Sequence, residues 1–415
     1  MVSRPSVKNA PRLPVNVMSR EFIENKFRYY RWMHEEAPVC QGGLSVMRVF
    51  FLAGYDDCAN ALNDPRLVRN RTTATGGGRF LFPLPKRLMP MLSSMITSDD
   101  PAHRRQRTLV SKAFTPKALG KLSERIETLT HELIDEAERH NTVDLLSAYS
   151  LPIPVTVIRE MLGIDEADMP RFRAGLRALS EGFSGWTLLR TLLVDMPRTV
   201  DLVEELIERK RSVPGDDILT GLIQAEAAGD KLSHEELVSM SILLIIAGYE
   251  TTVHLITNAV VTLLQHPEQF EALKADGTLL DAAVEEILRY AGPVHGTKPN
   301  YAMEDIEIRG VRIPKGAPVV PILGAANRDP AVFTNPEVFD IRRPPKKQLG
   351  FGHGPHHCLG AALARMETRI AIKTLIERCP NLRLAVPAGE LKLQRLPLWH
   401  RYERLPVILH PEGRR

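Results

Sequence analysis

The segment from Ser233 to His266 most constrains the fold, because it predicts a long helix that is apolar almost all round. Ser233 and Glu236 have capping-box spacing, and no proline follows before Pro267. At about 1.5 Å per residue, such a helix is roughly 50 Å long. A helix without a polar face has to be buried, so the rest of the chain must supply the elements that surround it.

The composition fits a large globular protein. The chain has 415 residues, of which 44% are hydrophobic and 25% charged, which is enough for a large core. No linker or repeat period divides the sequence, so we predict one domain over residues 1–415. We find no signal peptide and no apolar run that approaches the length of a bilayer span. The four cysteines are widely spaced, which suggests no disulfide framework and favours a reduced, cytoplasmic protein.

Apolar periodicity predicts a mainly α fold with small β-sheets (α+β). Most of the chain from Thr115 to Tyr290 has helical spacing, with breaks at prolines. Strands separated by turns are expected near the two ends, at Leu44–Gly54 and Leu391–Leu409. The long apolar helix lies inside the helical part and is expected to pass through the core.

The sequence AGYETT, from Ala247 to Thr252, interrupts this apolar helix at its centre. Gly248 costs about 1 kcal/mol relative to alanine inside a helix, and a buried Glu250 costs more unless it is paired. One interpretation is structural: Thr251 and Thr252 donate back to carbonyls one turn earlier, and Glu250 faces water. The other is functional: the helix opens a groove for a small ligand, and the acid and alcohol relay protons to it. The residues alone leave both open.

The loop FGHGPHHCLG, from Phe351 to Gly360, combines four potential metal ligands with three glycines. The potential ligands are His353, His356, His357 and Cys358. They would suit zinc, but they crowd onto one turn and no second pair of ligands appears elsewhere. The glycines indicate instead a backbone that approaches a flat ligand closely.

A helix is predicted directly after this loop, from Ala361 to Cys379, which places Cys358 at a helix N-terminus. Unpaired N–H groups and the helix dipole favour a thiolate there. A thiolate in a glycine-lined loop is a suitable axial ligand for haem iron and promotes O–O cleavage. The alternative is a buried, inert cysteine beside surface histidines.

Together these motifs resemble the signatures of the haem-thiolate monooxygenases, the cytochromes P-450. The cysteine loop fits F-x-x-G-x-x-x-C-x-G, and AGYETT and EEILR (Glu285–Arg289) fit two further signatures. More matches follow in chain order: DPRLVRNR, DDPAHRRQRTLVSKAF, IPKGAPVV, ANRDP and FDIRR. The resemblance covers nearly the whole chain and implies a soluble bacterial type of enzyme with haem b.

The resemblance also implies a role for each matching residue. Cys358 is the expected iron ligand, and Glu250 and Thr251 are the expected acid–alcohol pair that delivers protons during dioxygen activation. The expected haem contacts are His103, Arg107, His356, Phe351, Gly352, Gly360, Ala247, Gly248 and Asn300. In the first three of these, cationic side chains would bind the haem propionates.

Two further features concern the structure around the haem. Glu286, Arg289 and Arg343 are implied to form a buried network behind the cysteine loop, although the first pair alone would be an ordinary surface ion pair. Asn300 departs from the family pattern, because many members have an arginine that contacts a propionate there. We hypothesise a modestly shifted haem potential or affinity as the result.

The chain needs an external source of electrons, because it has no flavin or nicotinamide fingerprint and no CxxC-type cluster site. The expected donor is an acidic ferredoxin or flavodoxin. Residues 340–415 hold fifteen Lys and Arg against six Asp and Glu, a balance of +9. Arg342, Lys346, Lys347 and Arg369 are candidates for steering that donor, and a generic solvated face is the alternative. No basic stripe interleaved with aromatic residues suggests nucleic-acid binding.

The expected reaction is hydroxylation or epoxidation of a hydrophobic small molecule: a terpenoid, steroid, fatty acid or polyketide. The resemblance places the substrate walls at residues 72–98, 168–195, 245–251 and 293–297 and near Leu396, which include apolar segments. His295 and Lys86 are candidates for orienting a polar end. Two other functions remain open, a haem-binding sensor or carrier without turnover and a Cys/His zinc enzyme.

Overall fold

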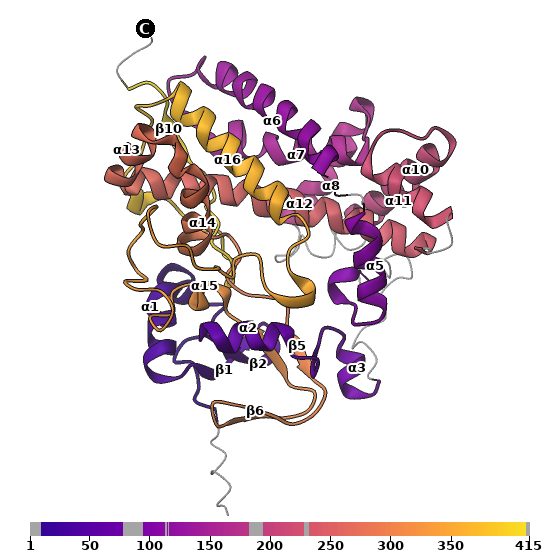
Figure 1. The fold of residues 1–415 in the computed structure, drawn as a ribbon, viewed down its shortest axis with the longest axis vertical. Coiled ribbons are helices and arrows are strands. Elements are labelled where there is room, and N and C mark those ends of the chain that lie inside the picture. The colour runs from indigo at the N-terminus through magenta and orange to yellow at the C-terminus, as the bar shows by residue number, and fades with distance from the viewer. Residues whose placement is uncertain are drawn as a thin grey trace, which may run out of the picture. The chain divides into compact units, whose positions relative to one another are not determined.

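A computed structural model describes residues 10–77, 94–112, 114, 116–181, 194–227 and 232–411 (Figure 1). The chain forms two compact units, each assembled from separate stretches of sequence. Unit 1 contains residues 1–79, 131–150 and 254–415, and unit 2 contains residues 80–130 and 151–253. The single domain expected from the sequence stays a prediction.

A five-stranded sheet in unit 1 has the strand order β1-β2-β8-β5-β3. Its strands are β1 (Val39–Leu44), β2 (Met47–Leu52), β8 (Pro318–Pro321), β5 (Asn300–Ala302) and β3 (Leu67–Val68). The expected strand region at Leu44–Gly54 corresponds to the end of β1, a turn with Ser45 at φ 54°, and β2. β6 (Ile306–Ile308) and β7 (Val311–Ile313) form a separate hairpin, whose turn has Gly310 at φ 76°.

A three-stranded sheet, also in unit 1, joins segments that are far apart in sequence. Its order is β4 (Val143–Asp144), β10 (Pro406–Ile408) and β9 (Arg383–Leu384). The strands expected over Leu391–Leu409 are therefore mostly wrong, because this segment has only β10 and isolated bridges such as Val294 to Trp399. Pro397 interrupts the apolar alternation here, and proline cannot donate to a strand ladder; the other proline of the segment, Pro406, is the first residue of β10.

Unit 1 also contains helices, two of which pack on strands of the five-stranded sheet. The helices are α1 (Arg20–Glu36), α2 (Tyr55–Asn63), α3 (Arg71–Thr75), α13 (Pro267–Ala275), α14 (Leu280–Ala291), α15 (Leu323–Ala326) and α16 (Ala361–Arg378). Ser19 caps α1 by accepting from the Phe22 amide, as expected for serine at an N-cap. α14 packs on α16, and α2 packs on α15.

Unit 2 is helical. It contains α5 (Ala102–Ser111), α7 (Pro152–Leu162), α8 (Met169–Glu181), α10 (Met196–Ser212) and α11 (Ile218–Ala227). α8 and α11 both pack on α10, and α11 also packs on α5 and α7. α6 (Pro116–Ala137) and α12 (His234–Gln265) each contain residues of both units. The prediction of a mainly helical fold with small sheets is confirmed.

α12 is the helix predicted from the apolar segment. Its capping box is formed as expected: the Glu236 amide donates to Ser233 at 3.2 Å and the Ser233 amide donates to Glu236 at 2.9 Å. Farther along, the Asn258 side chain donates to the carbonyls of Ala291 and His400, both at 2.8 Å.

The sequence-based view that no segment approaches a bilayer span needs correction. Length and apolar composition alone would allow α12 to cross a membrane. However, 67% of its most apolar window is buried within the protein, as in the core helix of a globular fold.

Candidate functional site

Cys358 lies in a tightly turned loop of unit 1. Its amide donates to the Phe351 carbonyl at 2.9 Å, and α16 begins three residues later at Ala361. Gly354 has φ 71°, and a Cβ there would lie 2.5 Å from the Leu62 carbonyl oxygen of α2. This glycine is therefore required for the loop to pack on α2. Cys358 is partly exposed, whereas the other three cysteines are buried.

The residues of the cysteine loop are accessible to solvent, whereas residues on either side of the loop are buried. Every residue from Phe351 to Gly360 is at least partly exposed, while Leu349 is 0% and Ala361 5% exposed. A Cβ on Gly360 would meet no atom within 4 Å, and one on Gly352 would meet only a backbone oxygen at 3.9 Å. The backbone here is thus open to close approach by a flat group, which fits a haem face.

The loop histidines do not form a metal cluster. Among the described residues, the one group whose ligand atoms all lie within 4.8 Å of one another is Glu138, Cys379 and His410. Burial, with a smaller effect of Lys347, lowers the pKa of His353. The zinc interpretation of this loop therefore has no geometric support in the described part of the chain.

Glu286, Arg289 and Arg343 come together in unit 1. Arg289 donates two bonds to the Glu286 carboxylate, both at 2.7 Å, and Arg343 Nε donates to it at 3.1 Å. The Arg289 side chain is 2% exposed and that of Glu286 is 4% exposed. Arg289 also donates to the carbonyls of Asn327, Pro336 and Val338, on the chain that leads toward the cysteine loop. The three residues thus form a buried ion-pair network that is bonded to the chain between Asn327 and Val338.

Asn300 is the first residue of β5 and is 3% exposed. Its amide nitrogen Nδ2 has no hydrogen-bond partner among the described residues. A buried donor without a partner costs about 1–3 kcal/mol, so a bound acceptor would relieve that cost. The side chain thus fits a neutral hydrogen bond to a carboxylate such as a haem propionate.

In unit 2, α12 has one uncovered stripe. Between Leu237 and Leu263 nearly all residues are buried, and the exceptions lie at positions spaced three and four apart. These are Leu243, Ile246, Ala247, Gly248, Glu250 and Thr251. The stripe is apolar at one end and carries the acid and the alcohol at the other, which suits an apolar ligand beside a proton-transfer pair.

The two threonines donate back along the helix. Thr251 donates to the Ala247 carbonyl at 2.8 Å and Thr252 to the Gly248 carbonyl at 3.3 Å. The two hydroxyls therefore make the helix-internal hydrogen bonds that the structural interpretation predicts. Thr251 is also half-buried on the stripe, and its oxygen can still accept a hydrogen bond.

The surroundings of Gly248 differ from those of the ligand groove that its position in the sequence suggests. A Cβ on this residue would lie 2.4 Å from Ile158 Cδ1 of α7. The glycine therefore allows α7 and α12 to approach closely within unit 2.

His103 and Arg107 lie one turn apart on α5. His103 is buried, with Nδ1 3.5 Å from Asp100 Oδ1, whereas Arg107 is half-buried. Burial lowers the pKa of His103, and the nearby Asp100 carboxylate only partly opposes this effect. His103 therefore suits a neutral hydrogen bond better than the cationic contact that the resemblance implies.

The expected substrate walls are described only in part. The predicted wall segments 78–93 and 182–193, and with them Lys86, lie outside the described residues. His295 is a core residue: it is 3% exposed, bonds to the Tyr30 hydroxyl at 3.1 Å and stacks on His400 at 5.5 Å. Burial lowers its pKa well below the usual value, so it is a neutral packing residue rather than a contact for a polar substrate.

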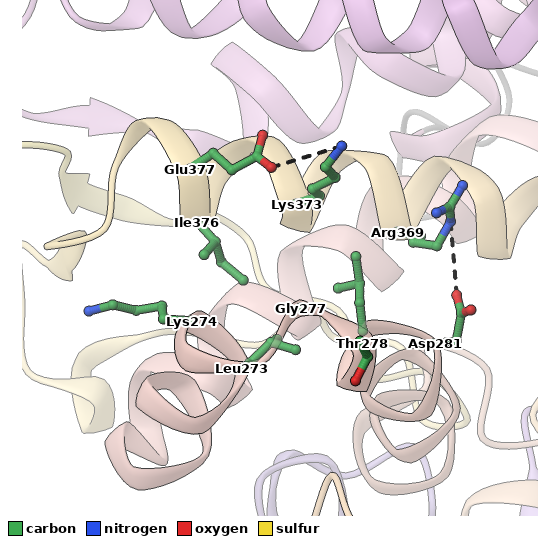
Figure 2. A pocket seen from close by; sticks show the side chains of 10 residues that line it. Leu273, Lys274, Gly277, Thr278, Asp281, Arg369, Lys373, Ile376 and Glu377 are labelled. Atoms are coloured by element: carbon green, nitrogen blue, oxygen red, sulfur yellow. Dashed lines mark ion pairs between the residues drawn. The ribbon is translucent and has the colours of Figure 1, made fainter.

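A groove of about 330 Å³ lies on unit 1 between α16 and the segment from α13 to α14 (Figure 2). Arg369 pairs with Asp281 at 3.9 Å, and Lys373 pairs with Glu377 at 3.8 Å. Such long, half-exposed pairs are worth about 0–1 kcal/mol. Arg369 thus faces a groove of mixed charge, whereas Arg342, Lys346 and Lys347 are exposed on the segment before the cysteine loop.

One cluster has no signal in the sequence. Glu138 lies more than 200 residues before Cys379 and His410 in the sequence, and none of the three belongs to a recognisable motif. The three-stranded sheet brings the chain segments next to these residues together.

Comparison with known proteins gives consistent results. The family model "Cytochrome P450" matches residues 194–385. Cytochrome P450 107B1 of Saccharopolyspora erythraea is 38% identical over 93% of this chain and 95% of that protein. Cytochrome P450 monooxygenase PikC of Streptomyces venezuelae is 36% identical over 96% of this chain and 94% of that protein.

A solved structure agrees over the same extent. The cytochrome P450 PksS of the Bacillus subtilis bacillaene polyketide synthase has a TM-score of 0.88 and 34% identity. The match covers 95% of this chain and 99% of that one.

Proposed function

This chain belongs to the cytochrome P450 family and is a monooxygenase with a cysteine-ligated haem iron, and from that premise we propose that Cys358 is the iron ligand and that the cofactor is haem b. The observation that carries the assignment is the partly exposed thiol in an accessible, glycine-containing loop at the start of α16. When bound, the haem supplies the dioxygen activation that inserts one oxygen atom into a substrate while the other leaves as water.

We propose that the remaining haem contacts are those that the family resemblance implies. Phe351, Gly352 and Gly360 would pack against the ring, as would Ala247 and Gly248 of the α12 stripe. His103, Arg107, His356 and Asn300 would bind the propionates. The unpartnered Asn300 amide supports its part in this assignment, and it supplies a neutral donor where an arginine is common in the family.

Glu250 and Thr251 are proposed to deliver protons to the reacting oxygen. Both lie on the accessible stripe, one after the other in sequence. Thr251 donates to the Ala247 carbonyl, so its oxygen can accept a hydrogen bond from a water while its own proton stays ordered, and the Glu250 carboxylate can accept from such a water. This arrangement would let the hydroxyl hold and pass on a proton without a buried charge.

We propose an apolar substrate of the polyketide, fatty-acid, steroid or terpenoid class. The apolar end of the α12 stripe, at Leu243, Ile246 and Ala247, supports this. The relatives act on or bind such compounds by name: a 6-deoxyerythronolide B hydroxylase, a vitamin D(3) 25-hydroxylase and a protein crystallised with myristic acid.

Isotope labelling combined with one substitution tests this function. With ¹⁸O₂, the wild-type product is expected to gain a single labelled oxygen atom. Thr251→Ala should keep the haem spectrum but lower the product formed per electron by about a hundredfold, because a positioned proton donor contributes about 10²–10⁴-fold to the rate. Product yield and electron consumption are measured in the same reaction.

Thr252→Ala is the matched control, because its hydroxyl also donates back along α12 but its side chain is buried. We expect its product yield per electron to equal that of the wild type. Equal yields for both variants would contradict the proton-delivery role of Thr251. Unlabelled product would contradict dioxygen as the oxygen source, and haem binding with no product from any compound class would indicate a carrier.

The proposed electron donor is an acidic ferredoxin or flavodoxin in the cytoplasm. Three exposed cations, Arg342, Lys346 and Lys347, precede the cysteine loop and support this choice. Arg369 contributes less, since Asp281 lies beside it.

Charge reversal at this segment is expected to slow reduction of the haem. The double variant Arg342→Glu with Lys347→Glu should lower the association rate by about tenfold or more at low ionic strength, and the difference should shrink as salt screens the charges. Stopped-flow reduction by an acidic ferredoxin measures the rate. Lys392→Glu with Arg395→Glu changes the same net charge at exposed positions elsewhere. If both pairs slow reduction equally, the effect is one of total charge and the docking proposal is wrong.

A further inference from the structure

Glu138, Cys379 and His410 form a compact set of metal-ligating side chains in unit 1. Each offers one ligand atom, and these atoms all lie within 4.8 Å of one another. They come from three places: Glu138 directly follows α6, Cys379 directly follows α16, and His410 lies two residues beyond β10. None of them belongs to the cysteine loop or to the α12 stripe.

The three-stranded sheet explains why these residues meet. β4 begins five residues after Glu138, β9 begins four residues after Cys379, and β10 ends two residues before His410. In the sheet, Val407 of β10 pairs with Val143 of β4 on one side and with Leu384 of β9 on the other. Backbone pairing of the adjacent strands thus brings the three chain segments that carry these residues together.

The accessibility of the three side chains also suits a bound ion. Cys379 is fully buried, whereas the side chains of Glu138 and His410 are 26% and 28% exposed. An ion could therefore enter from solvent past the carboxylate and imidazole and reach the thiol at the inner end. A thiolate, an imidazole and a carboxylate form a donor set typical of Zn²⁺, which keeps a fourth position for water when the protein supplies three ligands.

We propose that Glu138, Cys379 and His410 bind a zinc-class divalent cation that is separate from the haem iron. Binding replaces the proton of the Cys379 thiol with the metal, and that proton passes to solvent. The metal would join the end of α6, the end of α16 and the segment after β10, and so hold the C-terminal part of the chain in place.

The neighbouring charges compete with the metal. His410 Nε2 lies 3.1 Å from Glu138 Oε1, and Arg378 donates to Glu138 at 3.2 Å and to Asp135 at 2.7 Å. Without a metal, this arrangement is an ion-pair cluster beside a buried thiol. With one, Arg378 can keep its bond to Asp135 while Glu138 and His410 turn toward the ion. Metal binding and a simple ion-pair cluster are the two interpretations that an experiment has to separate.

Equilibrium dialysis of the haem-loaded full chain against buffered free Zn²⁺, under reducing conditions, makes this test. We expect one zinc per chain by elemental analysis. His410→Ala should weaken binding by more than about 100-fold, since even the loss of an outer contact to a metal site costs roughly 10–100-fold. Cys379→Ser should do the same and should remove the thiolate-to-metal charge-transfer band that Cd²⁺ produces in the near ultraviolet.

Two matched controls identify binding elsewhere. His234→Ala removes an exposed histidine of unit 2, and Cys40→Ser removes a buried cysteine of unit 1. Both should bind zinc like the wild type. His410 is partly exposed, so its variant is informative even if the Cys379 variant does not fold. Equal zinc binding by wild type and His410→Ala, or no binding by the wild type, would overturn the proposal and leave an ion-pair cluster.

Discussion

Cys358→Ser is expected to abolish both the thiolate spectrum and the monooxygenase activity of the haem-loaded protein. Wild-type protein, reduced with dithionite and exposed to carbon monoxide, should show a strongly red-shifted Soret band. The serine hydroxyl differs by one atom but is not a thiolate, so it cannot donate the electron density that promotes O–O cleavage. Absorption spectra before and after carbon monoxide give the result directly.

Cys40→Ser is the control for this substitution, because it makes the same atomic change at a buried thiol of the same unit. Burial raises the pKa of Cys40 to about 12, so this residue stays a neutral thiol and its loss should leave the Soret band in place. A red-shifted band that survives Cys358→Ser would contradict the axial assignment. A band at the position typical of histidine-ligated haem in the wild type would contradict it as well.

Glu286→Ala is expected to destabilise the protein by about 3–5 kcal/mol, because it leaves the Arg289 guanidinium buried without its carboxylate. That loss is a large part of the roughly 5–15 kcal/mol that holds a domain folded. Since Arg289 and Arg343 also bond to the carbonyls of Val338 and its neighbours, the chain leading to the cysteine loop should loosen and haem incorporation should fall. Urea unfolding and the haem content per chain measure the two effects.

Glu285→Ala makes the same substitution one residue earlier. Its carboxylate pairs with Arg365, but both side chains are about 40% exposed, at 43% and 39%. Removing such an exposed pair should cost about 0–1 kcal/mol. If the two variants lose equal stability, burial of the Glu286 network does not account for its effect, and its structural role would have to be reconsidered.

The parts of the fold that follow a local rule are those that the sequence predicts well. The capping box at Ser233 and Glu236 and the unbroken apolar run predict α12 to within one residue at each end. The C-terminal strands are mostly wrong, because β10 pairs with β4, which lies far away in the sequence, and with β9, which lies outside the predicted segment.

Within the candidate site, residue types were easier to predict than environments. The motif around Glu286 and Arg289 indicates a pair, but its burial depends on the chain from Asn327 to Arg343 that folds over it. Gly248 illustrates the same limit. Its position at the helix centre is visible in the sequence, whereas its contact with Ile158 exists only in the packed structure.

The Asn258 hydrogen bonds have a consequence for the angle at which α12 presents its stripe. Asn258 follows Thr251 by seven residues, so at 3.6 residues per turn the two side chains point to the same side of the helix to within about 20°. By donating to two carbonyls at once, Asn258 ties this side of α12 to the chain at Ala291 and at His400. A residue inserted between the two positions would swing Thr251 by about 100° relative to that anchor, while leaving every residue of the stripe chemically unchanged.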